Sequence, residues 1–437
     1  MDSVWQKNTL RPQFKVQRSD IKTDVLIIGG GMAGILCAHR LQKAGVPYVL
    51  AETDRICSGI TKNTTAKLTV QHGLIYDKLI RTFGFDAAKQ YLNANLAALE
   101  EYRALCREID CDFSVQDSYV YSLDDPKKLA DELLTLERLG LPAEAAAEFP
   151  FPLQIAGAVR IHDQAQFHPL KFAYSIAKPL NILENTKVLE LSPDGARTEH
   201  GFIRAEKIIV ATHFPFINKH GSYFLKLYQH RSYVLALKNA PAVTGMYVDE
   251  NEKGMSFRAY NDLLLLGGGS HRTGKKGGGW AELESFAQRT WPDAEIVTRW
   301  ATQDCMSLDG VPYIGQYSKR TPNLYVASGF NKWGMTSSMA AAMLLTDMIL
   351  GKENPNAAVF SPSRSILRPQ LAVNAAEAVF NLLTPTVPRC PHLGCALKYN
   401  AQEHSWDCPC HGSRFAPDGA LLDNPATVGK KHPISRS

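Results

Sequence analysis

A strand, a glycine turn and a helix near the N-terminus constrain the fold of this chain more than any other feature. The apolar run 24–28 leads into Gly29, Gly31 and Gly34, spaced as G-x-G-x-x-G, and then into a helical stretch, 35–44. In such a unit the first glycine permits the turn, the second lets the backbone approach a pyrophosphate, and the third lets the helix pack on the strand. The next strand ends at Glu52, where a carboxylate can bind the ribose of an adenosine. The segment therefore predicts a Rossmann-like dinucleotide-binding domain.

A second feature lies near the C-terminus, where Cys390 and His392 form a C-x-H pair and, after a spacer of fifteen residues, Cys408 and His411 form a C-x-x-H pair. Thiolates and imidazoles brought together in this way bind a metal ion or an iron-sulfur cluster. Two Cys and two His also fit a tetrahedral zinc ion, so these four residues alone leave both sites open.

Two further cysteines, Cys395 and Cys410, favour the cluster because a zinc site does not need them. The boxes C-x-H-L-G-C and C-P-C-H-G-S resemble the Rieske family of 2Fe-2S proteins. The resemblance implies that Cys390 and Cys408 bind one iron, that His392 and His411 bind the other, and that Cys395 and Cys410 form a disulfide. Rieske proteins of high potential carry a Tyr at the position of Phe415. Its absence predicts a reduction potential in the low or middle part of the Rieske range.

Segments spread over the first 350 residues resemble the D-amino-acid-oxidase-like family of flavoproteins, to which glycine oxidase and sarcosine oxidase belong. These segments are 57–67, 185–188, 205–212 and 323–336. The resemblance implies FAD as the cofactor and adds the following cofactor contacts: Thr65, Ala66, Val188, Gly329, Gly334, Met335 and Thr336. The last three begin a helix, whose N-terminal dipole can stabilise the negative charge of a reduced flavin.

The order of these features predicts an α/β protein with an inserted α+β substrate domain and a small C-terminal Rieske unit. We place the flavoprotein at 1–351, with FAD-binding segments at about 22–84, 173–227 and 302–351 and the substrate domain at about 85–172 and 228–301. Residues 352–387 form a linker and a helix, and the cluster unit follows at 388–437. The apolar stripe Leu371, Ala375, Ala378 and Leu382 predicts how that helix packs.

Composition excludes several classes of protein. The 437 residues are 45% hydrophobic and carry a formal net charge of only +5, with the basic residues dispersed, so neither nucleic acid nor a membrane surface is an expected partner. The polar N-terminus and the absence of about 18 consecutive apolar residues predict a cytoplasmic protein without an integral membrane segment.

Catalytic residues are harder to identify from the sequence. The candidates are polar side chains in segments where the flavoprotein family contacts substrate or oxygen: Arg258, Tyr260, Tyr233, His72 and Lys332. Each is equally compatible with a structural role.

Amino-acid oxidases of this family carry a carboxylate-binding Arg a few residues before a D-G-x-P segment. Here Asp309 begins that segment, and 302–308 contain no Arg. A free amino acid would lack its bidentate partner, which leaves amines, N-methyl compounds and hydroxy compounds as substrates.

Together the two units predict an FAD-dependent oxidoreductase that oxidises a small amine or a related donor. It would pass electrons singly through the Rieske cluster to an external acceptor. Two alternatives remain open, namely an oxidase that uses dioxygen and keeps a structural or regulatory cluster, and a redox sensor.

Overall fold

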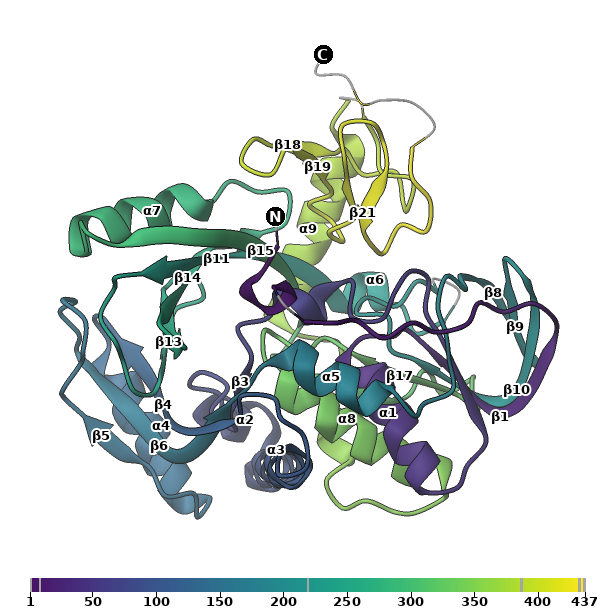
Figure 1. The fold of residues 1–437 in the computed structure, drawn as a ribbon, viewed down its shortest axis with the longest axis horizontal. Coiled ribbons are helices and arrows are strands. Elements are labelled where there is room, and N and C mark those ends of the chain that lie inside the picture. The colour runs from purple at the N-terminus through teal and green to yellow at the C-terminus, as the bar shows by residue number, and fades with distance from the viewer. Residues whose placement is uncertain (1, 8, 218–219, 386–387, 431–433, 435–437) are drawn as a thin grey trace.

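The computed structural model describes residues 2–7, 9–217, 220–385, 388–430 and 434. Two large sheets form the body of the molecule, and a small four-stranded sheet forms a C-terminal unit on its surface (Figure 1). This arrangement confirms the predicted fold class.

The first sheet contains the strand that leads into the glycine turn. Its parallel strands lie in the order β17 (Leu324–Ser328), β10 (Gly201–Val210), β1 (Ile21–Ile28), β2 (Tyr48–Ala51) and β7 (Ile182–Leu183), with β16 (Tyr313–Gln316) antiparallel at the edge. Val25 to Ile28 are all buried, as expected for a strand covered on both faces. Helices α1 (Met32–Lys43), α3 (Phe85–Cys106) and α8 (Gly334–Ile349) pack together, and β8 (Val188–Ser192) and β9 (Gly195–Thr198) extend the sheet as a hairpin.

The second sheet has nine strands and contains the alternating segments predicted for the substrate domain. It comprises β15 (Glu295–Ser307), β11 (Leu227–Lys238), β14 (Leu263–Arg272), β13 (Ser256–Tyr260), β12 (Met246–Asp249), β4 (Ser114–Ser122), β6 (Gly157–Gln166) and β3 (Lys67–Leu68), with β5 (Glu144–Ala146) beside β6. Strand β11 pairs along its length with both β14 and β15. These three strands meet the C-terminal unit at one end (Figure 1).

The remaining helices are short or peripheral. They are η1 (Val4–Gln6), η2 (Ile60–Asn63), α2 (Tyr76–Phe83), α4 (Pro126–Arg138), α5 (Pro169–Ala177), α6 (Tyr223–Lys226), α7 (Gly279–Thr290) and η3 (Ala358–Phe360). No helix in the described part of the chain is long and apolar enough to cross a membrane.

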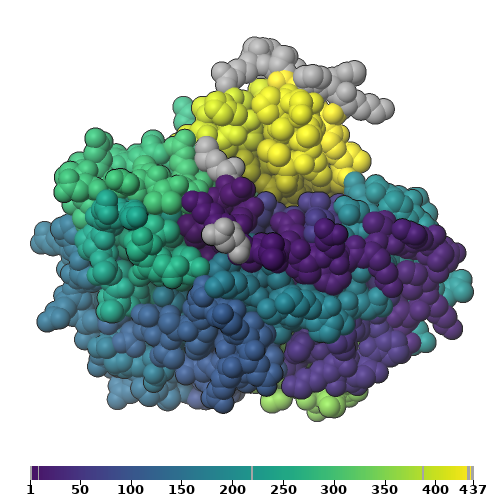
Figure 2. Space-filling model, in the orientation of Figure 1, coloured from purple at the N-terminus to yellow at the C-terminus, as the bar shows by residue number. Residues whose placement is uncertain are grey.

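The C-terminal unit is a meander of β18 (Lys398–Asn400), β19 (Ser405–Asp407), β20 (Arg414–Phe415) and β21 (Leu421–Asp423). Its core consists of a few apolar side chains, among them Leu397, Trp406 and Phe415, together with the cysteines of the two boxes. Figure 2 shows the unit as a yellow knob seated on the larger body. A core this small gives little stability of its own, so the contacts with the body matter.

Helix α9 (Pro369–Leu383) forms near the predicted range, but the predicted packing stripe is wrong. The helix buries Asn374 and Asn381, while Ala375 is exposed and Leu382 is 45% exposed. The reason is that the surfaces it meets are polar. Asn374 Oδ1 accepts a hydrogen bond from Arg272 Nη1 at 2.8 Å, and the Asn381 carbonyl accepts one from the Ala396 N–H at 3.0 Å.

The segment before helix α9, which was expected to be a linker, is bound to the body of the molecule at Arg364. The Arg364 guanidinium donates two hydrogen bonds of 2.8 Å to the carboxylate of Asp309, and both side chains are buried. This pair holds the end of the segment against the D-G-x-P turn.

A buried ion network joins the C-terminal unit to β11. The Glu403 carboxylate accepts hydrogen bonds from Arg231 Nε at 2.9 Å, Arg414 Nη2 at 2.8 Å and the Tyr233 hydroxyl at 3.0 Å. Burial disfavours the charged carboxylate, but Arg231 and Arg414 outweigh burial and lower the pKa of Glu403 from 4.5 to about 2.

This pKa predicts an acid-sensitive attachment of the unit. Because the folded-state pKa lies below the unfolded value, the stabilisation is fully present above about pH 4.5 and is lost as the pH falls towards 2. We expect Glu403→Gln to lower the melting temperature at neutral pH and to flatten its decline across that window, as measured by differential scanning calorimetry. Glu353→Gln, at an exposed carboxylate, is the control. Parallel pH profiles for Glu403→Gln and the unsubstituted protein would contradict this prediction.

Candidate active site and cluster site

A cavity of about 950 Å³ is lined by residues of both large sheets and by 421–424, 426 and 427 of the C-terminal unit. Its size lies at the upper end of the range for ligand sites in proteins. It contains seven of the eleven predicted cofactor contacts, namely Gly29, Gly31, Glu52, Thr65, Val188, Gly334 and Met335.

The glycine turn has the geometry that a pyrophosphate site needs. Gly29 has φ +110°, and a Cβ there would lie 2.6 Å from the Ala211 carbonyl oxygen. A Cβ on Gly34 would lie 1.9 Å from the Gly29 carbonyl oxygen, so only glycine lets α1 approach β1 this closely. Gly31 opens into the cavity at the N-terminus of α1, where the first helical N–H donates to the Thr61 hydroxyl at 3.1 Å. The positive end of the helix therefore faces the space where an anion can bind.

Glu52 follows β2, as predicted, and its carboxylate spans the turn. One oxygen accepts the Gly30 N–H at 2.6 Å and the other accepts the Asp54 N–H at 2.9 Å. Burial raises the pKa of Glu52, and these backbone hydrogen bonds oppose that effect. Each oxygen keeps a second lone pair, so the carboxylate can still accept a ribose hydroxyl from the cavity side.

The segment expected to face the flavin ring is held from behind by Arg258. Its Nη1 donates to the Thr65 carbonyl at 2.7 Å and to the Ala66 carbonyl at 2.9 Å, while Ala66 adopts φ +56°. Trp5 packs under the guanidinium and donates to the Thr64 carbonyl at 2.7 Å. Arg258 and Ala66 lie outside the cavity lining, so the structure places Arg258 as a support of the segment. Trp5 lies in no motif of the sequence, so its role could not be predicted.

Lys67 belongs to the same segment and lines the cavity. Burial, together with the nearby Arg258 charge, lowers the pKa of Lys67 to about 7. Its Nζ donates to the Thr65 hydroxyl at 3.2 Å.

Gly334 and Met335 line the cavity at the N-terminus of α8, which no side chain caps. Thr336 and Gly329 lie outside the lining. The Thr336 hydroxyl donates to the Thr69 carbonyl at 2.8 Å, and Gly329 has φ +73° beside Leu227. These two residues shape the turn into the helix.

Three of the five catalytic candidates line the cavity: His72, Tyr233 and Lys332. The His72 ring is fully engaged, because Nε2 contacts the Thr69 carbonyl at 2.8 Å and Nδ1 contacts the Tyr91 hydroxyl at 2.6 Å. Burial lowers the pKa of His72 to about 3, so the ring is neutral. Tyr260 lies away from the cavity and donates to the Asp112 carboxylate at 2.9 Å.

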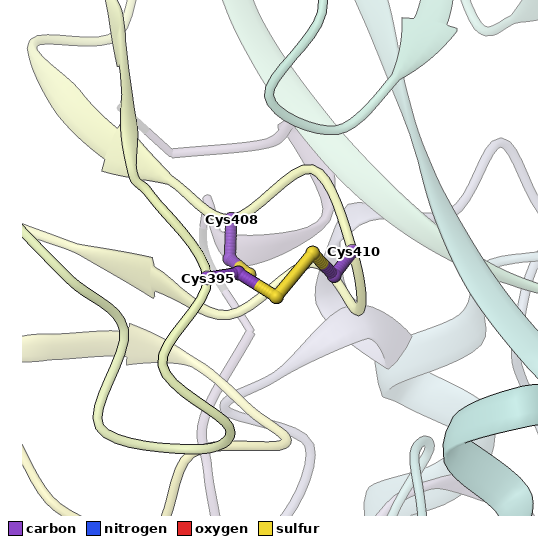
Figure 3. A group of neighbouring side chains, drawn as sticks. All are labelled: Cys395, Cys408 and Cys410. Carbon is purple, nitrogen blue, oxygen red and sulfur yellow. A yellow bond between two sulfur atoms is a disulfide. The ribbon is translucent and has the colours of Figure 1, made fainter. Parts of the chain in front are cut away.

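The two Cys/His boxes form facing loops. A disulfide joins Cys395 to Cys410 with a Cα–Cα distance of 6.7 Å, and Cys408 lies beside it (Figure 3). The His392 and His411 ring centroids are 4.9 Å apart. The Cys390 sulfur contacts the Cys408 thiol, and this contact lowers the pKa of Cys390.

The donor set fits an iron-sulfur cluster. Cys390 and Cys408 are free thiols, and His411 Nδ1 is buried without a hydrogen-bond partner among the described residues. A buried ring nitrogen without a partner is costly unless it binds something. The closest group of sulfurs, Cys395, Cys408 and Cys410, is no alternative metal site, because two of the three are oxidised in the disulfide.

The second loop is docked on the large nine-stranded sheet through its backbone. Buried side chains of the large sheet donate to the carbonyl oxygens of four consecutive residues, 409–412: Arg272 to Pro409 at 3.0 Å and to Cys410 at 3.3 Å, Gln229 to His411 at 2.9 Å, and Gln303 to Gly412 at 2.9 Å. Nearby, Asn424 donates to the Thr212 and Phe214 carbonyls at 2.7 and 3.0 Å.

Comparison with known proteins agrees with this geometry. Residues 24–348 match the family model described as FAD dependent oxidoreductase. The chain belongs to the FAD-dependent oxidoreductase family. Residues 381–433 match the Rieske [2Fe-2S] domain, so the protein is an oxidoreductase whose cofactors are FAD and a Rieske-type 2Fe-2S cluster. Both resemblances expected from the sequence are confirmed.

A relative from Bacillus subtilis, named putative Rieske 2Fe-2S iron-sulfur protein YhfW, is 34% identical over 97% of this chain and 96% of its own length. Gamma-glutamylputrescine oxidoreductase of Escherichia coli is 23% identical over 77% of this chain and 86% of its own length. Among solved structures, glycine oxidase from Geobacillus kaustophilus superposes with a TM-score of 0.67 at 20% identity, covering 79% of this chain and 100% of that chain. This structural likeness concerns the fold.

Arg258 offers a test of the support behind the flavin-facing segment. Arg258→Met leaves two buried carbonyl groups without their donor, at a cost of about 1–3 kcal/mol each. We expect a lower melting temperature in both the FAD-loaded and the FAD-stripped protein, together with weaker FAD binding. Arg289→Met, at an exposed site, is the control. A decrease confined to the FAD-loaded protein would show instead that Arg258 contacts the cofactor directly.

Phe415 provides a test of cluster tuning. The ring is fully buried beside the ligand loops, where Ser413 Oγ accepts the Ala426 N–H at 2.9 Å. We expect Phe415→Tyr to raise the midpoint potential of the cluster in protein-film voltammetry, because a hydroxyl donor to a ligand sulfur stabilises the reduced state. Phe224→Tyr, which adds the same hydroxyl beside His411 from the flavoprotein side, is a matched control. An unchanged midpoint potential in Phe415→Tyr would show that the residue at position 415 does not tune the cluster.

Proposed function

We propose that the protein oxidises a small amine, or a related donor with a CH–NH or CH–OH bond, and passes the electrons singly to an external acceptor. FAD supplies hydride acceptance and the 2Fe-2S cluster supplies one-electron transfer. The proposed cluster ligands are Cys390, Cys408, His392 and His411. Gly29, Gly31, Glu52 and the uncapped N-terminus of α8 are proposed to hold the FAD.

The contacts of Gln229 support the proposal that the two units exchange electrons. Gln229 Nε2 donates to the carbonyl of the proposed ligand His411 at 2.9 Å, and Gln229 Oε1 lies 3.1 Å from His213 Nε2. Because the amide nitrogen already faces two carbonyls, its oxygen faces the ring, and His213 Nε2 carries the proton. His213 lines the cavity, so two hydrogen bonds join the cavity wall to a cluster loop. Electron transfer rates fall steeply with distance, and a direct contact of this kind favours rapid exchange.

The lining of the cavity supports an amine donor. No arginine is among the described residues that line it, so a substrate carboxylate has no bidentate guanidinium partner there. Carboxylates outnumber lysines along the walls, which favours a substrate of neutral or positive charge. The name of the Escherichia coli relative, gamma-glutamylputrescine oxidoreductase, points to the same class of donor.

The function can be tested by anaerobic stopped-flow spectroscopy with a panel of alkylamines, N-methylamines, hydroxy acids, glycine and D-amino acids. We expect an amine to bleach the flavin, and a Rieske electron paramagnetic resonance signal to follow. Glycine and D-amino acids should react slowly. If the flavin bleaches while the cluster stays oxidised, and air then yields stoichiometric hydrogen peroxide, the protein is an oxidase and the relay is wrong.

A matched pair of variants tests the contact. Gln229→Leu should slow cluster reduction without changing the rate of flavin bleaching. Gln303→Leu removes the donor to the next carbonyl, Gly412, and serves as the control, because the described hydrogen bonds of the Gln303 side chain, with Thr273 and Gly412, do not reach a residue that lines the cavity. Equal slowing in both variants would mean that Gln229 only helps to dock the loop.

A further inference from the structure

One wall of the cavity carries a chain of polar side chains that the cofactors do not explain. Asp304 Oδ2 accepts a hydrogen bond from Ser232 Oγ at 3.1 Å, Ser270 Oγ donates to Ser232 Oγ at 3.1 Å, and Lys332 Nζ donates to Ser270 Oγ at 3.3 Å. All four residues line the cavity. They come from β15, β11, β14 and the turn before α8, so adjacent strands hold a carboxylate at one end of the chain and an ammonium group at the other.

Strand β15 presents further polar atoms on the same wall. Thr302, Asp304 and Met306 line the cavity, as the two-residue period of a strand requires. The Thr302 side chain is only 9% exposed, and its hydroxyl has no hydrogen-bond partner among the described residues. A buried hydroxyl without a partner is rare unless a ligand completes it.

The Asp304 carboxylate also has unused hydrogen-bond acceptor positions. A carboxylate offers about four acceptor positions, and within the described part of the chain only the Ser232 hydroxyl donates to it. No described ion pair includes Asp304, which is half-buried in the wall of the cavity. Burial raises the pKa of Asp304, and the charges of Lys332 and His213 oppose that effect from a distance. A carboxylate in such a place is stabilised by a cation that enters the cavity.

We propose that Asp304 is a specificity-determining residue that binds a cationic nitrogen of the donor, with the Thr302 hydroxyl as a neighbouring hydrogen-bonding group. This inference rests on the proposed function and narrows its substrate class. The nitrogen next to the oxidised C–H bond must be uncharged to release a hydride, so the cation at Asp304 is a second nitrogen of the same molecule. Alkyl diamines and related aminoalkyl compounds have this composition.

The direct test is equilibrium binding of butyltrimethylammonium to the oxidised holoprotein by isothermal titration calorimetry. This probe is permanently charged and does not reduce flavin. We expect Asp304→Asn to raise its Kd by about tenfold or more, because the variant keeps the shape of the side chain and removes the charge. Glu252→Gln, which removes another carboxylate from the same cavity, should change the Kd less than about twofold.

Flavin content and the cluster signal of each variant are measured first, so that a loss of binding is not mistaken for a loss of cofactor. An unchanged Kd in Asp304→Asn with both cofactors bound would overturn the inference, as would an equal loss in Glu252→Gln. The second arm compares kcat/KM for an alkyl diamine with that for the monoamine of the same chain length. Asp304→Asn should abolish the preference for the diamine.

The two proposals fail separately. If the probe binds through Asp304 but no amine bleaches the flavin, the cation site stands and the proposed oxidation is wrong. If amines reduce the flavin and Asp304→Asn neither weakens binding of the probe nor alters the diamine preference, the oxidation stands and Asp304 has no role in specificity.

Discussion

Buried backbone carbonyl groups need donors, and this requirement determines how the two units of the protein join. The second cluster loop turns four consecutive carbonyls, 409–412, towards the flavoprotein, which meets them with Arg272, Gln229 and Gln303. Two glycines make the close approach possible. A Cβ on Gly412 would lie 2.6 Å from Gln229 Cβ, and one on Gly274 would lie 2.7 Å from the Pro409 nitrogen. A unit with so small a core is thereby stabilised by hydrogen bonds that it cannot form alone.

The segment predicted to face the flavin also has its backbone carbonyls held by a buried donor behind it. Arg258 lies outside the cavity, yet it holds the carbonyls of Thr65 and Ala66 and contributes to the lowered pKa of Lys67. One buried guanidinium thus fixes the backbone of the wall and influences the charge of a side chain that faces the cavity.

The sequence was most informative where short-range chemistry determines structure. The glycine turn, the strand before it and the four Cys and His residues carry their own geometric requirements, so their positions could be predicted. The roles of Arg258 and Tyr260 could not be predicted, because the alternation of residues along a strand identifies its two faces but does not show which face borders the cavity. The apolar stripe of helix α9 predicted that the helix packs through apolar residues. That prediction was wrong because a helix sequence does not reveal its partner surface, which here presents a guanidinium and a backbone N–H. Asp304 lies in the segment before the D-G-x-P turn, and its significance depends on Ser232 and Ser270, which are distant in sequence.

The wall formed by 421–424, 426 and 427 has a consequence for how such a protein can be altered. These residues belong to the C-terminal unit by sequence and to the cavity by position, and the Lys187 ammonium donates to the Thr427 carbonyl across the boundary. Removing the C-terminal unit, or exchanging it for another electron carrier, would open one side of the cavity to water. The boundary between the two family domains therefore does not separate the cavity from the cluster unit. A domain exchange that preserves the cavity has to retain these residues of the Rieske unit.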